Sequence, residues 1–296
     1  METFWIILIA SLAAINCSLV GTYLVLRKLA MVADAITHAV LPGIVLAFLF
    51  TGSKSSWVML LGASITGIIA TLLMAFLHKK VKLQADASIG ITFTWLFALG
   101  IILISLFSRK VDLDPDCVLY GEVAHAPLNV WQTASGMRLG PRSMYLLGFM
   151  LLINLSFILL SYKELAITTF DPAFATTIGM RTTLWHYLLM AATSFTAVAS
   201  FEVAGAILVV ALFVVPASTA YLLTQRLSTM LVIATLLGIG TATSGYYLAV
   251  WLNGSIAGAM TTIAGTMFLV VFLIRQYYEK RPCPQATYIP LKDSAA

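Results

Sequence analysis

The chain has 296 residues, of which 60% are hydrophobic and only 10% are charged, and its mean hydropathy is +0.98. A soluble domain carries about 25% charged residues, so this composition excludes a water-soluble globular protein. The net charge of +5 at pH 7 does not require nucleic acid as a partner, because membrane proteins concentrate Lys and Arg in their inner loops.

Nine segments are apolar for about the 20 residues that a helix needs to cross a bilayer. We therefore predict an all-α, polytopic membrane protein. The predicted spans are Phe4–Leu26, Leu29–Phe50, Trp57–Leu77, Ala87–Ser108, Ser143–Tyr162, Thr182–Phe201, Val203–Gln225, Thr229–Leu252 and Ile256–Ile274. With the N-terminus outside and the C-terminus inside, 12 of the 17 Lys and Arg residues are cytoplasmic, as the positive-inside rule favours. Residues 1–280 are thus expected to form one transmembrane domain, and 281–296 a disordered cytoplasmic tail.

The second span carries two ionisable residues, Asp34 and His38. Four residues apart on a helix, they share one face, with Cβ atoms about 5–6 Å apart. A carboxylate oxygen and an imidazole nitrogen are both good ligands for Mn²⁺, Fe²⁺ or Zn²⁺. An isolated Asp at mid-bilayer costs about 2.5–3.5 kcal/mol, so the pair is expected in the bundle interior or an aqueous path. From the residues alone, three interpretations stay open: a metal site, a helix cap beside a hydrogen-bonded interior histidine, and a proton relay.

Prolines mark two candidate gates. Pro42 and Gly43 follow His38 by one turn and predict a kink in the second span. Pro216 lies inside the seventh span. Glu202 stands in the one-residue break between the sixth and seventh spans, where it is a weak candidate for a third metal ligand or an interface residue.

Two loops differ from the short connections elsewhere. The outer loop Arg109–Arg142 holds acidic residues and a histidine, which indicate either a solvated acidic loop or a mouth that guides cations or docks a partner. These residues are Asp112, Asp114, Asp116, Glu122 and His125. The inner loop Lys163–Arg181 predicts a short helix that is either interfacial or a docking element. Asp171 is its expected N-cap, Pro172 its first residue and Gly179 its stop.

Several catalytic motifs are absent from the sequence. It contains no Gly-x-x-x-x-Gly-Lys-Ser/Thr, so the chain cannot hydrolyse ATP through a P-loop of its own. It also lacks His-Glu-x-x-His and Gly-x-Ser-x-Gly, the signatures of membrane metalloproteases and esterases. We therefore expect a transport protein, not an enzyme.

Three segments together resemble a known family. Arg27–Gly43, which contains the Asp34–His38 pair, is similar to the signature of the manganese/zinc/iron ABC importer permeases of the ABC-3 type. Phe170–Gly179 and Phe201–Thr224 match the same family in the same order, and the resemblance extends through Tyr278. Ala33 stands where the family typically has Ser or Gly, and Thr37 stands where it typically has Ser. Both departures are small and leave the Asp–His pair intact.

The resemblance implies a type II ABC importer-like permease in the bacterial cytoplasmic membrane. Two permease chains, as a homodimer or a paralogue heterodimer, would form the path within membrane lipid. Two ATPase subunits would bind below, and an extracytoplasmic metal-binding lipoprotein or periplasmic protein would deliver the ion. Asp34 and His38 match the positions thought to contact metal. A coupling helix with Asp171, Pro172, Phe174, Ala175 and Gly179 would fit into each ATPase.

The transported ion itself is the only metal that the resemblance calls for, with no permanently bound cofactor. Oxygen and imidazole donors favour Mn²⁺ or Fe²⁺ over a thiolate-built Zn²⁺ site. The outer segment Asp112–Glu122 resembles the manganese/iron branch. The alternative function is an ion-coupled secondary metal transporter that works without an ATPase.

Overall fold

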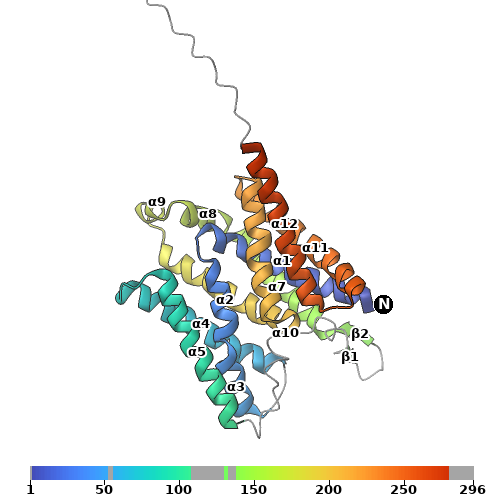
Figure 1. Cartoon of the computed structure of the whole chain (residues 1–296). Helices are drawn as coiled ribbons and strands as arrows, with labels where there is room; N and C mark the ends of the chain where they lie inside the picture. Colours follow the sequence, from blue (N-terminus) through green and yellow to red (C-terminus); the bar gives the residue numbers. More distant parts are fainter. Residues whose placement is uncertain (1, 53–55, 108–129, 133–137, 280–296) are drawn as a thin grey trace, which may run out of the picture.

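The computed structural model describes residues 2–52, 56–107, 130–132 and 138–279 (Figure 1). Within these residues, nine helical segments are long and apolar enough to cross a membrane, which confirms the predicted number. They are α1 (Glu2–Leu26), the pair α2 (Ala30–Ala39) and α3 (Leu41–Thr51), α4 (Ser56–Lys80), α5 (Ala85–Phe107), α7 (Arg142–Leu160), the two halves of α10 (Thr182–Leu223), α11 (Leu227–Leu252) and α12 (Ile256–Glu279).

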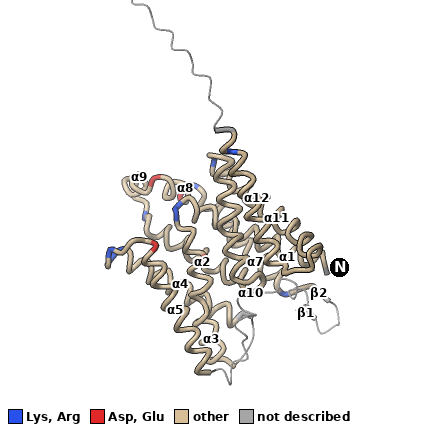
Figure 2. Tube along the Cα trace, viewed as in Figure 1, with Lys and Arg blue, Asp and Glu red and all other residues tan. Residues whose placement is uncertain are grey.

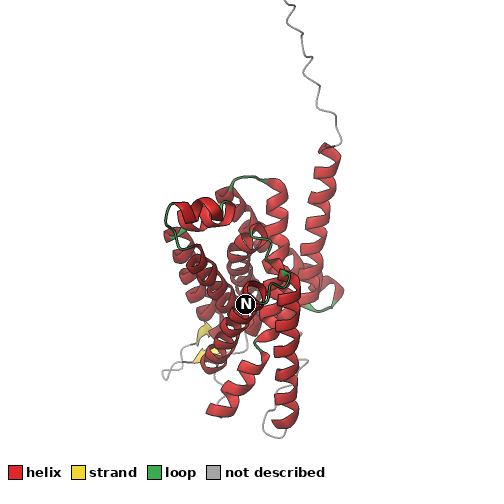
Figure 3. Ribbon diagram, turned by 90° about the vertical axis from the view of Figure 1, so that its left-hand side faces the viewer, coloured by secondary structure: helices red, strands yellow, loops and turns green. Residues whose placement is uncertain are grey.

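A short antiparallel pair of strands precedes α7, where the sequence predicts only a loop. Strand β1 (Val130–Gln132) pairs with β2 (Arg138–Pro141). Both views place these strands toward the lower end of the bundle (Figure 1 and Figure 3). The other predicted features of this loop, namely Asp112, Asp114, Asp116, Glu122 and His125, lie outside the described residues, as does the tail 281–296.

Helix α1 lies at the centre of the packing, where small residues let other helices approach closely. A Cβ at Gly21 would collide with the carbonyl oxygen of Phe213 on α10. A buried polar network strengthens the same region: Asn154 of α7 donates to Asn16 of α1 over 2.9 Å and to Thr196 of α10 over 2.8 Å. Hydrogen bonds therefore tie together three helices that are far apart in sequence.

The second span is interrupted. Helix α2 ends at Ala39 and α3 begins at Leu41, with Pro42 in its first turn. A Cβ at Gly43 would collide with the carbonyl oxygen of Gly62 and the hydroxyl of Thr66, so α3 packs closely against α4 there. The sequence places a kink at Pro42 and Gly43, and the structure places the interruption at Val40, just before them.

The apolar spans divide at Glu202 as predicted, into Thr182–Phe201 and Val203–Leu223, but the backbone bends three residues later, at Gly205. Gly205 has φ 74° and ψ 165°, and it is where α10 departs from helical geometry. The two halves of α10 meet there at an angle (Figure 1). Pro216 lies within the second half, so its role as a gate stays a prediction.

The fifth span ends at Leu160, and a separate helix, α8 (Tyr162–Phe170), follows it. Most of α8 falls in the predicted inner loop Lys163–Arg181, where only the later helix was expected, because α8 begins without a side-chain cap. Helix α9 (Pro172–Thr177) follows next. Figure 2 shows that most of the drawn Lys and Arg residues gather at the end of the bundle that carries α8 and α9. By the positive-inside rule this end faces the cytoplasm.

Candidate functional site

Asp34 and His38 lie on one face of α2, as their spacing predicts. Oδ1 of Asp34 is 3.5 Å from Nε2 of His38, and their side chains are 34% and 26% exposed. The His38 ring packs near Phe93 and Phe97 of α5, with ring centroids 6.1 and 5.6 Å away. The pair thus sits beside an aromatic wall and keeps part of its surface open to an incoming ligand.

The pair supplies two metal donors and no more. In the described part of the chain, no group of three or more His, Cys, Asp or Glu side chains could hold a metal ion. Glu202 belongs to α10, but its side chain lies outside what the structure describes, so its role as a weak ligand stays a prediction. Any further metal ligand, from other residues or from another chain, would have to reach the exposed face of Asp34 and His38.

Arg27 connects the turn before α2 to helix α8. Its Nη2 donates to Oγ1 of Thr168 over 2.9 Å, and its Nε donates to Oγ1 of Thr169 over 3.0 Å. Burial lowers the pKa of the Arg27 guanidinium, which is nevertheless so basic that it stays protonated at physiological pH. In the sequence, Arg27 is an inner-loop charge that opens the family-like segment Arg27–Gly43, and nothing local to it shows that α8 folds back against it.

Helix α9 begins as its sequence predicts. The carboxylate of Asp171 accepts a hydrogen bond of 2.8 Å from the backbone N–H of Phe174, and Pro172 occupies the first turn. The helix ends at Thr177, and Gly179 follows at φ 82°, a conformation that favours glycine. Ala175 is buried, whereas Phe174 and Ile178 are 53% and 51% exposed. The short helix therefore presents an apolar surface outward at the cytoplasmic end.

Comparison with known proteins identifies the fold. The model of the ABC 3 transport family matches residues 2–275. The chain belongs to this family. Over 269 residues it is 45% identical to the manganese transport system membrane protein MntD of Bacillus subtilis, a match that covers 91% of this chain and 90% of that protein.

Two further matches agree. The zinc transport system membrane protein TroD of Treponema pallidum is 42% identical over 276 residues, which cover 92% of this chain and 73% of TroD. A solved structure of PsaBC from Streptococcus pneumoniae in complex with Fab superposes with a TM-score of 0.76 at 28% identity, covering 93% of both chains. The resemblance inferred from the sequence motifs is thereby confirmed. The chain is a multi-pass permease of the bacterial cytoplasmic membrane.

Proposed function

We propose that the chain is the membrane-spanning subunit of an ATP-driven importer for a divalent transition metal, with Mn²⁺ the favoured cargo and Fe²⁺ or Zn²⁺ next. The observation that carries this proposal is the partly exposed Asp34–His38 pair within a membrane span. Its oxygen and imidazole donors suit these ions. Similar proteins are named as manganese, zinc and iron transport membrane proteins, and manganese recurs among them.

The pair would be completed by a second permease chain. Two donors per chain are too few for these ions, but the same open face on two protomers would bring four donors together. The site would be weak, since an ion that is held too tightly cannot leave. Such a shared site would explain why the side chains of Asp34 and His38 remain 34% and 26% exposed in the single chain.

Helix α9 would couple the metal path to ATPase subunits. Phe174 of α9 and Ile178, the residue that follows the helix, form an exposed apolar surface outside the membrane spans, where burial against another protein stabilises the contact. Movement of α9 would reach the α1–α2 turn through α8 and Arg27. The resulting mechanism is alternating access driven by ATP, with an extracytoplasmic metal-binding protein supplying the ion. Residues 1–280 would form the transmembrane domain, and 281–296 a cytoplasmic tail.

Metal accumulation tests the proposal. The chain is expressed with its ATPase and binding protein in a host that lacks metal uptake, and Mn, Fe and Zn are counted per cell. We expect wild type to raise one metal strongly and the Asp34→Asn variant, which removes the charge but keeps the shape, to lose at least about 90% of that gain. Asp86→Asn is the matched control, because Asp86 is an exposed residue at the start of α5 and away from the pair.

Three results discriminate between the interpretations. Equal accumulation by Asp34→Asn and wild type, at equal membrane abundance, would show that the metal pair is wrongly assigned. Accumulation that persists with a catalytically dead ATPase would favour the ion-coupled carrier. No rise in any of the three metals from an assembled complex would rule out the substrate class.

A further inference from the structure

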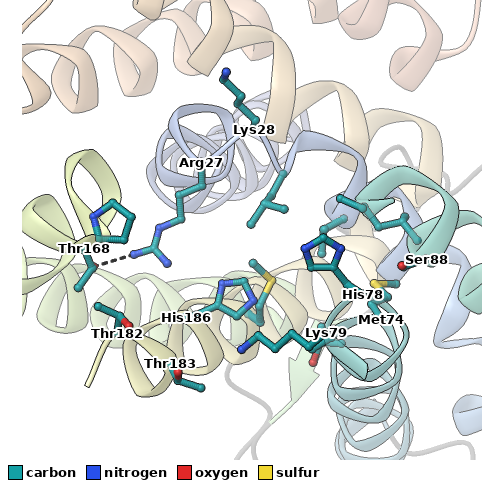
Figure 4. A pocket seen from close by; sticks show the side chains of 18 of the residues that line it. Arg27, Lys28, Met74, His78, Lys79, Ser88, Thr168, Thr182, Thr183 and His186 are labelled. Carbon is teal, nitrogen blue, oxygen red and sulfur yellow. Dashed lines mark hydrogen bonds between the residues drawn. The ribbon is translucent and has the colours of Figure 1, made fainter. Parts of the chain in front are cut away.

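A cavity of about 490 Å³ opens at the cytoplasmic end of the bundle. It lies between the α1–α2 turn, the end of α4, the start of α5, the α8–α9 segment and the start of α10 (Figure 4). Asp34 and His38 do not line it, whereas Val32 does. On a helix with 3.6 residues per turn, Val32 points about 160° away from Asp34. The cavity is thus separate from the metal pair.

The cavity is basic. Arg27, Lys28 and Lys79 line it together with His78 and His186, and no Asp or Glu is among its described lining residues. The partners of these groups are neutral: Arg27 donates to two threonine hydroxyls, His78 contacts the carbonyl oxygen of Leu83, and Nζ of Lys79 lies 5.5 Å from the centre of the Tyr187 ring. Among the described lining residues, no carboxylate neutralises this positive charge, and the charge opposes entry of a cation.

Figure 4 shows how these groups are arranged. The guanidinium of Arg27 and the amine of Lys79 approach His186 from different elements, and the hydroxyls of Thr182 and Thr183 lie along the same edge. Guanidinium, ammonium and hydroxyl donors that converge from several directions match the several acceptor oxygens of a phosphate group. The chemistry of this edge is that of an anion site.

The remaining wall is apolar. Leu29 and Val32 of the second span, Met74 of α4 and Ile89 of α5 face the same space. A small hydrated anion gains nothing from contact with an apolar surface, whereas a phospholipid joins a charged phosphate to apolar acyl chains that can pack against it. Basic pockets between transmembrane helices on the cytoplasmic side are suited to anionic headgroups.

We propose that this cavity binds the phosphate group of an anionic phospholipid of the inner leaflet, held by Arg27, Lys79 and His186. A bound headgroup would bridge α4, α10 and the turn that leads to α2. This site does not depend on which metal the protein carries, or on whether the Asp34–His38 pair binds it.

The test uses the full chain, purified in detergent as the assembled transporter. Its melting temperature is followed against short-chain phosphatidylglycerol, phosphatidylcholine of the same length, and inorganic phosphate at constant ionic strength. We expect saturable stabilisation by phosphatidylglycerol. Lys79→Gln should weaken the apparent affinity for phosphatidylglycerol about fivefold, because one Lys or Arg near an anionic lipid surface changes the binding constant by about that factor. Lys80→Gln is the matched control: Lys80 is adjacent on α4 but does not line the cavity, and its amine lies over Phe76.

The outcomes separate the sources of the phosphate. If inorganic phosphate binds saturably and Lys79→Gln weakens that binding, the cavity is an anion site for a soluble phosphate, and the proposed lipid ligand is wrong. The site is overturned if neither phosphatidylglycerol nor inorganic phosphate binds saturably. It is also overturned if phosphatidylcholine binds as tightly as phosphatidylglycerol, or if Lys79→Gln and Lys80→Gln change the affinity equally. His186→Leu, which removes a polar group but keeps an apolar side chain, provides a second variant for the same comparison.

Discussion

Arg27 and Thr168 join the turn before α2, the helix that carries Asp34 and His38, to the cytoplasmic helix α8, through a hydrogen bond of 2.9 Å from Nη2 to Oγ1. A second bond of 3.0 Å, from Nε to Thr169, makes the contact two-pronged. Since α2 begins three residues after Arg27 and α9 follows α8 directly, the guanidinium is placed to pass a movement of α9 to Asp34 and His38.

Replacing Arg27 by Lys keeps the charge but removes the planar, two-pronged donor. Hydrogen bonds to charged groups contribute about 1.5–3 kcal/mol, so we expect the metal transported per ATP hydrolysed to fall about tenfold while ATP hydrolysis continues. The measurement is paired uptake and ATPase activity in proteoliposomes. Lys163→Gln is the control, because Lys163 is exposed at the start of α8 and does not line the basic cavity. Equal loss of transport and ATPase activity would indicate a folding defect and not a coupling role.

Asn154 should be a main stabilising residue of the bundle, because its side chain is buried and donates to both Asn16 and Thr196. Asn154→Leu removes both hydrogen bonds and is expected to cost about 1–2 kcal/mol, the range for polar contacts between membrane helices. A lower melting temperature in detergent measures this loss. Ser156→Leu, at an exposed position of the same helix, should leave the melting temperature nearly unchanged.

The features that the sequence predicted well are local. Apolar run length sets the number of spans, and the Asp171–Pro172 start of α9 follows from backbone hydrogen bonding within four residues. The Asp34–His38 pair was found because i, i+4 spacing fixes a shared helix face.

The features that it missed depend on contacts between distant segments. The bonds from Arg27 to α8 span more than 140 residues of sequence, and the cavity around His186 needs five elements to close. The bend in α10 is a separate case: the apolar spans divide at Glu202 as predicted, but the backbone turns three residues later, where a glycine permits it, at Gly205.

Gly205 should not tolerate a side chain. Its φ of 74° and ψ of 165° lie in a region that is essentially restricted to glycine, so Gly205→Ala is expected to destabilise the protein by about 1–3 kcal/mol. Thermal unfolding of the purified permease tests this, with Gly148→Ala as the matched control. A Cβ at Gly148, inside α7, would meet nothing within 4 Å, so that variant should be neutral or slightly stabilising. A neutral Gly205→Ala would mean that the backbone there is not fixed.

Phe174 should anchor the ATPase. Its ring is 53% exposed on a helix capped by Asp171, and aromatic anchors at protein interfaces contribute about 2 kcal/mol or more. Phe174→Ala is therefore expected to weaken ATPase binding at least about tenfold, measured with purified subunits in detergent. Leu160→Ala provides the control, because Leu160 is 84% exposed but lies at the end of α7, outside α9. If both substitutions weaken binding equally, the apolar surface of α9 is not the docking element.

His38 should set which ion passes. A thiolate is a softer ligand than imidazole and favours Zn²⁺ over Mn²⁺, so His38→Cys is expected to lower Mn²⁺ uptake and raise the ratio of Zn²⁺ to Mn²⁺ about tenfold. Competitive uptake of the two ions into cells measures that ratio. Val32→Cys places the same thiol on α2, but on the side that lines the basic cavity, and should leave the ratio unchanged. If the Zn²⁺ to Mn²⁺ ratio shifts equally in both variants, a thiol anywhere on α2 changes it, and the effect says nothing of the ion path. If the ratio shifts in neither variant, His38 is not part of the ion path.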